Sequence, residues 1–337
     1  MKISVVMPVY NGEEHLAESI DSILSQTCGD FEFLIINEYG SSPEATGILE
    51  NYAERDQRIR LIHNETKLGL AESLNKGFRM ANGKYIARMD ADDRSAPTRF
   101  EKEAAYLDAH PETSVCGSWQ EHFGRYTDFH RPAENNDDLR AAFLFKCDVC
   151  HSTVMLRKTD FVGNNLFYDP QKAAEDYDLW LRAAFEYGLQ FHTIPEILGY
   201  YRLSENSISE AKLEQLQQEG IQTAKEQLMR LGVHISHNDE ILLAAWNMTV
   251  FGGNRNLLKR VERLFSVIVK KNRQCGQFKE KSLQKAIEMR REQVMCAFQQ
   301  NIPQGRKEKI KRFLMGYPIL YTAAWHIVQA EKRLFHN

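Results

Sequence analysis

Residues 85–93 read Tyr-Ile-Ala-Arg-Met-Asp-Ala-Asp-Asp, so a mainly apolar run leads directly into three carboxylates. The apolar part predicts a buried β-strand over 85–89, and Asn82-Gly83 before it marks the end of a helix. Crowded like charges are costly unless a cation binds them or solvent screens them. The stretch 90–93 is therefore either a site for Mg²⁺ or Mn²⁺, which prefer oxygen ligands, or a solvated acidic turn.

The chain before this stretch alternates between strand and helix signals. Apolar runs predict strands at 3–9, 31–36 and 59–62, each followed by apolar residues at helical spacing. This repetition is typical of an α/β fold with a mostly parallel sheet covered by helices on both faces. Such sheets bind ligands at the carboxyl ends of their strands. The polar residues expected to gather at that rim are Asn11, Glu13, Glu38, Asp90 and Asp92.

The chain after this stretch changes character near residue 207. Further strands are predicted at 115–116 and 154–156, a helix at 177–187, and two strands on either side of Pro195 within 191–201. From about residue 207 strand signals cease and amphipathic helices follow. We therefore predict an α/β domain over 1–208 and a helical region over 209–337.

The net charge of -3 conceals a basic C-terminal region. Residues 255–333 contain nineteen Lys and Arg against six Asp and Glu. The densest basic run, 306–312, precedes an aromatic and aliphatic segment, which favours peripheral contact with an anionic membrane. A solvated helical face and a homodimer contact are the alternatives. Nucleic acid is not expected as a partner, because no recognition motif is present and the acidic body repels phosphate.

Localisation signals in the sequence are few. The N-terminal apolar run meets polar residues too early for a signal peptide, and no run of about 18 apolar residues is present. The six cysteines are expected to be reduced thiols. These features predict a cytoplasmic protein that contacts the inner face of the cell membrane peripherally.

A second acidic pair, Glu175-Asp176, precedes an apolar helix. Carboxylates at this position can cap the helix and complement its dipole. A carboxylate facing a site for a metal and a diphosphate could instead take a proton from an attacking hydroxyl. Taken alone, the Glu175-Asp176 pair favours the helix-capping role.

Seven stretches follow the motif order and approximate spacing of a known family. They are Ser4–Glu13, Ser22–Thr27, Phe31–Ile36, Gly69–Gly77, Tyr85–Asp93, Glu175–Arg182 and Tyr200–Arg202. Through them, residues 3 to about 205 resemble the inverting glycosyltransferases of family 2, which have the GT-A fold. Many members build bacterial surface polysaccharides on lipid-linked saccharides.

The resemblance implies a role for each matching residue. The donor nucleotide would be bound by Pro8, Val9, Tyr10, Asn11, Glu13, Glu38 and Asp90. Asp92 would bind Mn²⁺ or Mg²⁺, Asp176 would be the general base, and Glu175 would help to hold the acceptor. In-line attack would invert the anomeric carbon without a covalent intermediate.

Three departures from the family pattern affect these roles. Asn37-Glu38 replaces the common Asp-Asp pair, which bears on the choice of uridine. Ser204 replaces a His that helps to bind the metal in many members, so His151 is a candidate substitute and Arg202 a further candidate site residue. The Gln-x-x-Arg-Trp signature of processive synthases is absent, which favours addition of a single sugar.

The expected function is transfer of a single hexosyl or N-acetylhexosaminyl group from a nucleotide-sugar. UDP-sugars are the expected donors, and the expected acceptor is a hydroxyl of a lipid-linked saccharide in O-antigen, capsule or exopolysaccharide synthesis. The alternatives are a sugar nucleotidyltransferase and a catalytically weakened relative that only binds nucleotide-sugars.

Overall fold

The computed structural model describes residues 2–203, 213–236, 240 and 255–300. The chain divides into two compact units: Met1–Leu139 with Cys147–Leu216, and Arg140–Lys146 with Gln217–Asn337. Residue 208 lies outside the described residues, so the predicted domain boundary there stays a prediction.

The first unit contains the predicted alternation of strands and helices. Its elements up to the fourth strand are β1 (Ile3–Val9), α1 (Glu13–Leu24), β2 (Phe31–Asn37), α2 (Pro43–Arg55), β3 (Ile59–His63), α3 (Gly69–Met80) and β4 (Tyr85–Arg88). Then follow β5 (Arg94–Ser95), α4 (Arg99–Ala109), β6 (Thr113–Gly124), β7 (Asp128–His130), α5 (Asn136–Ala142), the 3-10 helix η1 (His151–Thr153), β8 (Met155–Arg157), α6 (Lys158–Phe161), α7 (Glu175–Phe185) and β9 (Gln190–Leu203). The α/β fold class predicted from the sequence is confirmed.

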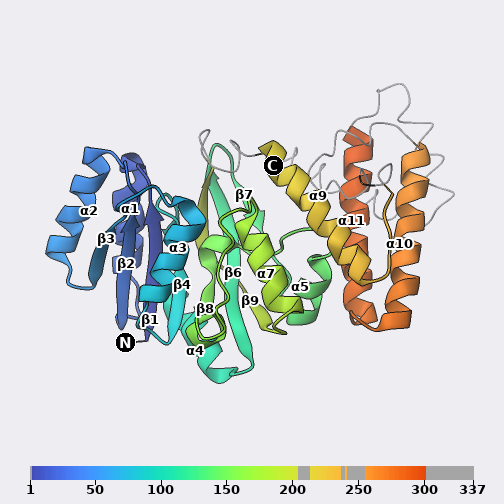
Figure 1. Ribbon diagram of the computed structural model, residues 1–337, viewed down its shortest axis with the longest axis horizontal. Coiled ribbons are helices and arrows are strands. Elements are labelled where there is room, and N and C mark those ends of the chain that lie inside the picture. The colour runs from blue at the N-terminus through green and yellow to red at the C-terminus, as the bar shows by residue number, and fades with distance from the viewer. Residues whose placement is uncertain (1, 204–212, 237–239, 241–254, 301–337) are drawn as a thin grey trace, which may run out of the picture. The chain divides into compact units, whose positions relative to one another are not determined.

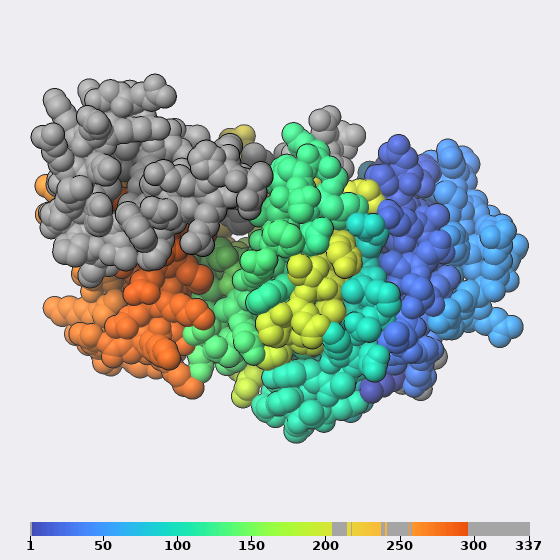
Figure 2. All heavy atoms as spheres, turned by 180° about the vertical axis from the view of Figure 1, so that it is seen from behind, coloured from blue at the N-terminus to red at the C-terminus, as the bar shows by residue number. Residues whose placement is uncertain are grey.

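One sheet runs through this unit in the order β3-β2-β1-β4-β8-β6-β9-β5, with β7 paired to β6 (Figure 1). The first four strands are parallel, as the alternation predicted. The later strands are mixed, because β8 pairs antiparallel with both β4 and β6 whereas β6 and β9 are parallel. Seen from behind, the surface of β9 lies against that of the segment around α4 (Figure 2).

The prediction of two strands around Pro195 is wrong, because β9 continues through this residue. In the register with β6, Ile194 pairs with Ser118 and Ile197 pairs with Trp119, so two residues of β9 have no counterpart. A proline lacks an N–H for the ladder and is tolerated at such a bulge. The strand therefore bends at Pro195 without ending.

The sheet is covered on both faces. Alternate residues of β1 point to opposite sides, and one set, including Val5 and Met7, packs in a core with apolar residues of α1, α2 and α4. On the opposite face α3 packs closely, since a Cβ added at Gly77 would lie 2.3 Å from a methyl of Val6. This double cover leaves the carboxyl ends of β1, β2 and β4 as the accessible rim.

The second unit is helical where the structure describes it. Its helices are α9 (Leu213–Arg230), which begins at the division between the units, α10 (Arg255–Cys275) and α11 (Glu280–Gln300). Apolar residues of α10 and α11, among them Phe265 and Ile287, are buried. No helix of the described residues has the length and apolarity needed to cross a membrane. The basic run 306–312 and the apolar segment after it lie outside the described residues.

Candidate functional site

Three aspartates, Asp90, Asp92 and Asp93, follow β4 at the rim of the sheet, and together they form the acidic cluster. Asp93 is 1% exposed, and its Oδ2 has no hydrogen-bond partner among the described residues. Burial, together with the charge of Asp90, raises the pKa of Asp92 and raises that of Asp93 well above its ordinary value. Buried carboxylates that repel one another form a site short of positive charge.

Arg88, the last residue of β4, supplies part of that charge. Its guanidinium forms an ion pair with the Asp90 carboxylate, and its side chain is only 4% exposed. The Nε of Arg88 has no hydrogen-bond partner among the described residues. Burying an unpaired cation in a strand costs free energy. The ion pair with Asp90 offsets that cost and explains why an arginine is tolerated here.

The end of β9 closes over the same cluster. The Arg202 backbone N–H donates to Asp93 Oδ1 at 2.9 Å, and its Nε donates to the Asp92 carbonyl at 2.9 Å. The Arg202 guanidinium also pairs with Glu18 of α1. Arg202, a candidate site residue from the sequence, therefore lies against the acidic cluster.

Asp176 lies in the first turn of α7. Its Oδ1 accepts the Tyr177 backbone N–H at 2.7 Å, and its Oδ2 accepts the Cys147 thiol at 3.7 Å. Burial raises the pKa of Asp176, while the Tyr177 N–H and the charge of Arg88 oppose the rise. A carboxylate with a raised pKa inside a site is a candidate proton acceptor. Glu175 is partly buried beside it.

His151 packs against two buried aromatic residues. Its Nε2 lies 2.8 Å from the Tyr168 hydroxyl, and its ring packs edge-on against Trp180 of α7. Desolvation and the nearby Arg88 lower the pKa of His151 well below its ordinary value, which favours the neutral ring. Tyr168 is fixed through its backbone, because Asn75 both donates to its carbonyl and accepts its N–H at 2.9 Å. For His151 to bind a metal ion, either Nε2 would have to give up the Tyr168 hydroxyl and bind the ion instead, or Nδ1 would have to be the ligand.

The end of β1 carries the predicted donor-binding residues. Val9 is buried, Pro8 is partly buried and Tyr10 is 51% exposed, with the Lys67 ammonium 4.7 Å from its ring centroid. Asn11 accepts the Ser42 N–H at 2.9 Å through its side chain, and Glu13 accepts the Ser42 hydroxyl. This Ser42 bond and backbone N–H groups lower the pKa of Glu13. Asn11 and Glu13 thus join the start of α1 to the start of α2.

Glu38 follows β2 and is engaged within the protein. Its two oxygens accept the backbone N–H groups of Tyr39, Leu68 and Gly69, at 2.6 to 3.1 Å, and also contact the side chains of Asn64 and Ser73. Burial alone would raise the pKa of Glu38, but these donors together lower it. The carboxylate anchors the start of α3, and its predicted contact with ribose or base would have to share these oxygens.

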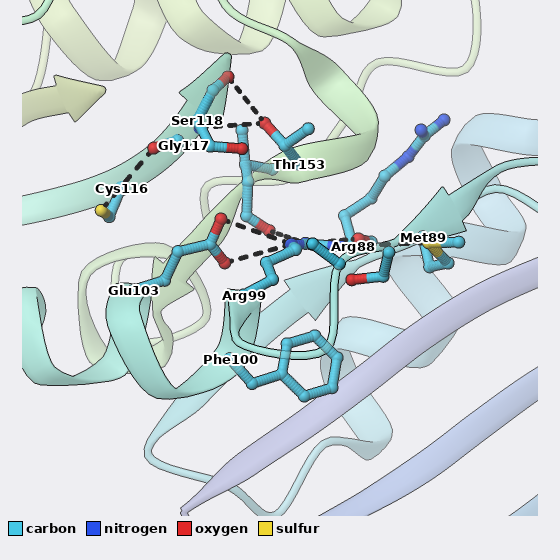
Figure 3. A network of polar contacts seen from close by, with 12 residues as sticks. Arg88, Met89, Arg99, Phe100, Glu103, Cys116, Gly117, Ser118 and Thr153 are labelled. Atoms are coloured by element: carbon cyan, nitrogen blue, oxygen red, sulfur yellow. Dashed lines mark hydrogen bonds and ion pairs between the residues drawn. The ribbon is translucent and has the colours of Figure 1, made fainter. Parts of the chain in front are cut away.

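A buried network behind β4 holds the strand that carries the cluster (Figure 3). Arg99 of α4 pairs with Glu103 and donates through Nη2 to the carbonyl oxygens of Arg88, at 2.8 Å, and Val154, at 3.3 Å. Arg88 in turn donates its backbone N–H to the Val154 carbonyl at 2.9 Å. The main chain just before Asp90 is therefore fixed from α4 and from the segment leading into β8.

The acidic cluster fits a hard divalent cation. The unpartnered Asp93 Oδ2 and the raised pKa of Asp92 both indicate carboxylates that lack a counter-charge. Within the described ranges no three His, Cys, Asp or Glu side chains form a set that could hold a metal ion alone. Mg²⁺ and Mn²⁺ sites that bind substrate phosphates commonly use one or two carboxylates, with water and phosphate as the remaining ligands.

The sequence did not predict that Arg88, Cys147 and Tyr168 would lie around the site. A signal existed for Arg88, because a cation inside an apolar run directly before three carboxylates is unusual. No local signal linked Cys147 or Tyr168 to the site, because Cys147 reaches it through contact with Asp176 of α7 and Tyr168 is held by Asn75 of α3.

Comparisons with known proteins agree on one family. The sequence profile described as Glycosyl transferase family 2 matches residues 4–163. The putative glycosyltransferase EpsE of Bacillus subtilis is 36% identical over 61% of this chain and 74% of its own length. The O-antigen biosynthesis glycosyltransferase WbnJ of Escherichia coli is 32% identical over 63% of this chain and 83% of its own length.

Solved structures with the same fold include two proteins in complex with nucleotide-sugars. TarS of S. aureus in complex with UDP-GlcNAc has a TM-score of 0.56 at 18% identity, covering 89% of this chain and 84% of that chain. The mannosyltransferase PcManGT of Pyrobaculum calidifontis, in complex with GDP-Man and Mn²⁺, has a TM-score of 0.54 at 15% identity, covering 84% of this chain and 78% of that chain. These similarities confirm the GT-A fold class. The sequence relationships show that this chain is a glycosyltransferase and belongs to family 2.

Proposed function

We propose that the chain transfers a single sugar from a UDP-sugar to a saccharide hydroxyl, with inversion at the anomeric carbon and with a divalent cation. The observation that carries this proposal is Asp176, a partly buried carboxylate at the start of α7 whose Oδ2 accepts the Cys147 thiol and whose pKa is raised by desolvation. Arg88 interacts electrostatically with both Asp176 and the acidic cluster. A proton acceptor and a cluster suited to a cation and a diphosphate thus share one electrostatic environment.

Asp176 would accept the proton of the acceptor hydroxyl as the oxygen attacks the anomeric carbon. One bond forms to the acceptor oxygen as the bond to the diphosphate breaks, and the diphosphate leaves with the bonding electrons. Bound Mn²⁺ or Mg²⁺, held by Asp92, would supply positive charge to the leaving diphosphate. Glu175 would hold the acceptor, and the rim from Pro8 to Glu13, with Glu38 and Asp90, would hold the nucleotide.

The acceptor class is proposed from the relatives. WbnJ is named for O-antigen biosynthesis, and an amylovoran biosynthesis glycosyltransferase of Erwinia amylovora is 28% identical over 62% of this chain. We infer a role in surface polysaccharide synthesis on a lipid-linked saccharide. The basic segment 306–312 would then hold the enzyme at an anionic membrane surface.

The experiment that tests the proposal compares wild type with Asp176→Asn. UDP release from a panel of UDP-sugars is measured with Mn²⁺ and saccharide acceptors, and the anomeric configuration of the product is determined by NMR. The variant should bind UDP normally but lose turnover by about 10²–10⁴-fold, the usual contribution of a general base.

The matched control is Asp178→Asn on the same helix, because Asp178 pairs with Arg182 on α7. This control should retain turnover within a few-fold. Equal activity of Asp176→Asn and wild type would exclude Asp176 as the base, and pyrophosphate in place of UDP as the product would indicate a nucleotidyltransferase.

A further inference from the structure

Arg88, the last residue of β4, forms an ion pair with Asp90, a predicted donor-binding residue. Its Nε is buried and unpartnered among the described residues. A buried guanidinium normally has its donors satisfied. Nε of Arg88 is therefore a donor that no described group of the fold uses.

Groups from several elements surround this cation. Asp90, Asp93 and the phenol of Tyr168 interact with its charge most strongly. The same charge acts on Asp176 of α7 and on His151 of η1. Around Asp176 the other titratable neighbours are the Cys147 thiol and Tyr168, with Glu175 next to it on α7.

The main chain at Arg88 is rigidly held. Its carbonyl accepts from Arg99 at 2.8 Å and its N–H donates to Val154 at 2.9 Å. Figure 3 shows the Arg88 side chain pointing away from the Arg99 guanidinium. Because the backbone is fixed by that second arginine, the Arg88 guanidinium is held towards the site and takes no part in the network behind it.

We propose that Arg88 is a positioning residue whose guanidinium holds the Asp90 carboxylate in the orientation that the donor nucleotide needs. This inference rests on the proposed function, since it takes Asp90 as a donor-binding residue. Holding the carboxylate needs the planar guanidinium fork, which a lysine side chain lacks.

Two substitutions test this role. Arg88→Lys retains the charge but lacks the fork, so UDP affinity should fall several-fold. Arg88→Met removes both the charge and the fork, so UDP affinity should fall about 10-fold or more, as expected for a lost charge-assisted hydrogen bond.

The matched control is Arg157→Met. Arg157 lies on β8, beside β4, and donates to the carbonyl oxygens of Leu107, His110 and Thr113, away from the acidic cluster. This variant should melt at a lower temperature yet keep the wild-type UDP affinity. UDP binding is measured by calorimetry with and without Mn²⁺.

The outcomes distinguish this inference from the proposed function. If Arg88→Met and Arg88→Lys bind UDP like wild type, or differ from it only in melting temperature as Arg157→Met does, Arg88 is merely structural and the inference fails. If Arg88→Met does not fold, Arg88→Lys decides alone: reduced UDP affinity supports the inference, and wild-type affinity overturns it. If wild type itself neither binds UDP nor transfers sugar, the proposed function fails.

Discussion

At the scale of single residues, Glu38 has a structural task that its sequence position did not reveal. Its carboxylate accepts hydrogen bonds from the main chain at Tyr39, Leu68 and Gly69. Glu38→Gln would turn an amide NH₂ towards some of these donors, leaving buried groups unsatisfied. The free energy of unfolding should fall by about 1.5–3 kcal/mol, the usual contribution of hydrogen bonds to a charged group. Denaturant titration at neutral pH measures it.

The effect of Glu38→Gln should depend on pH in a defined direction. The folded protein lowers the pKa of Glu38 below its ordinary value of 4.5, so its contribution is present above that pH and is lost as the pH falls below it. The difference between wild type and variant should therefore shrink in acid. Glu14→Gln, at a side chain that is 91% exposed, is the control and should change little. A constant difference down to pH 3 would contradict the carboxylate's role.

At the scale of elements, the turn between α3 and β4 determines where the acidic cluster lies. The Gly83 N–H donates to Ser4 Oγ at 2.8 Å, and an added Cβ would lie 2.6 Å from the backbone of Ile3 and Ser4. Gly83→Ala should therefore push β4 away from β1 and cost about 1–3 kcal/mol, as overpacking does. Because β4 leads into Asp90, UDP affinity should fall as well.

Gly29→Ala is the control for this turn, since nothing lies within 4 Å of its added Cβ. Thermal melting and UDP calorimetry on both variants check the prediction. An unperturbed melting temperature in Gly83→Ala would show that the turn adapts without displacing β4.

At the scale of the whole molecule, binding of UDP and Mn²⁺ should stabilise the protein by mass action. At ligand concentrations of about 100 Kd the gain is roughly 2.7 kcal/mol, which raises the melting temperature by several degrees in a domain of about 200 residues. Asp92→Asn relieves repulsion in the cluster, so without ligand it should melt at or above the wild-type temperature. The Asp92→Asn variant should lose the part of the melting-temperature increase that depends on Mn²⁺. A Mn²⁺-dependent shift of wild-type size in Asp92→Asn would exclude Asp92 as the metal ligand.

The predicted strands 3–9, 31–36 and 59–62 lie within a residue of those in the structure, because periodicity and turn residues are local signals. The strand after Pro195 was wrongly separated for the same reason, since only the pairing with β6 shows that the bulge is bridged. The surroundings of the candidate site divide in the same way. The sequence placed Asp90, Asp92 and Asp93 at the end of the strand β4, whereas it gave no sign that Cys147 lies against Asp176.

The sequence by itself determined the fold class, the family and the acidic cluster that ends β4, because each is written in contiguous residues. Only the tertiary structure decided that the Cys147 thiol lies against the Asp176 carboxylate, and that the Glu38 carboxylate is occupied by the start of α3. Burial and distance between residues remote in sequence set charge states and hydrogen bonds, and neither quantity is contained in a local pattern of side chains.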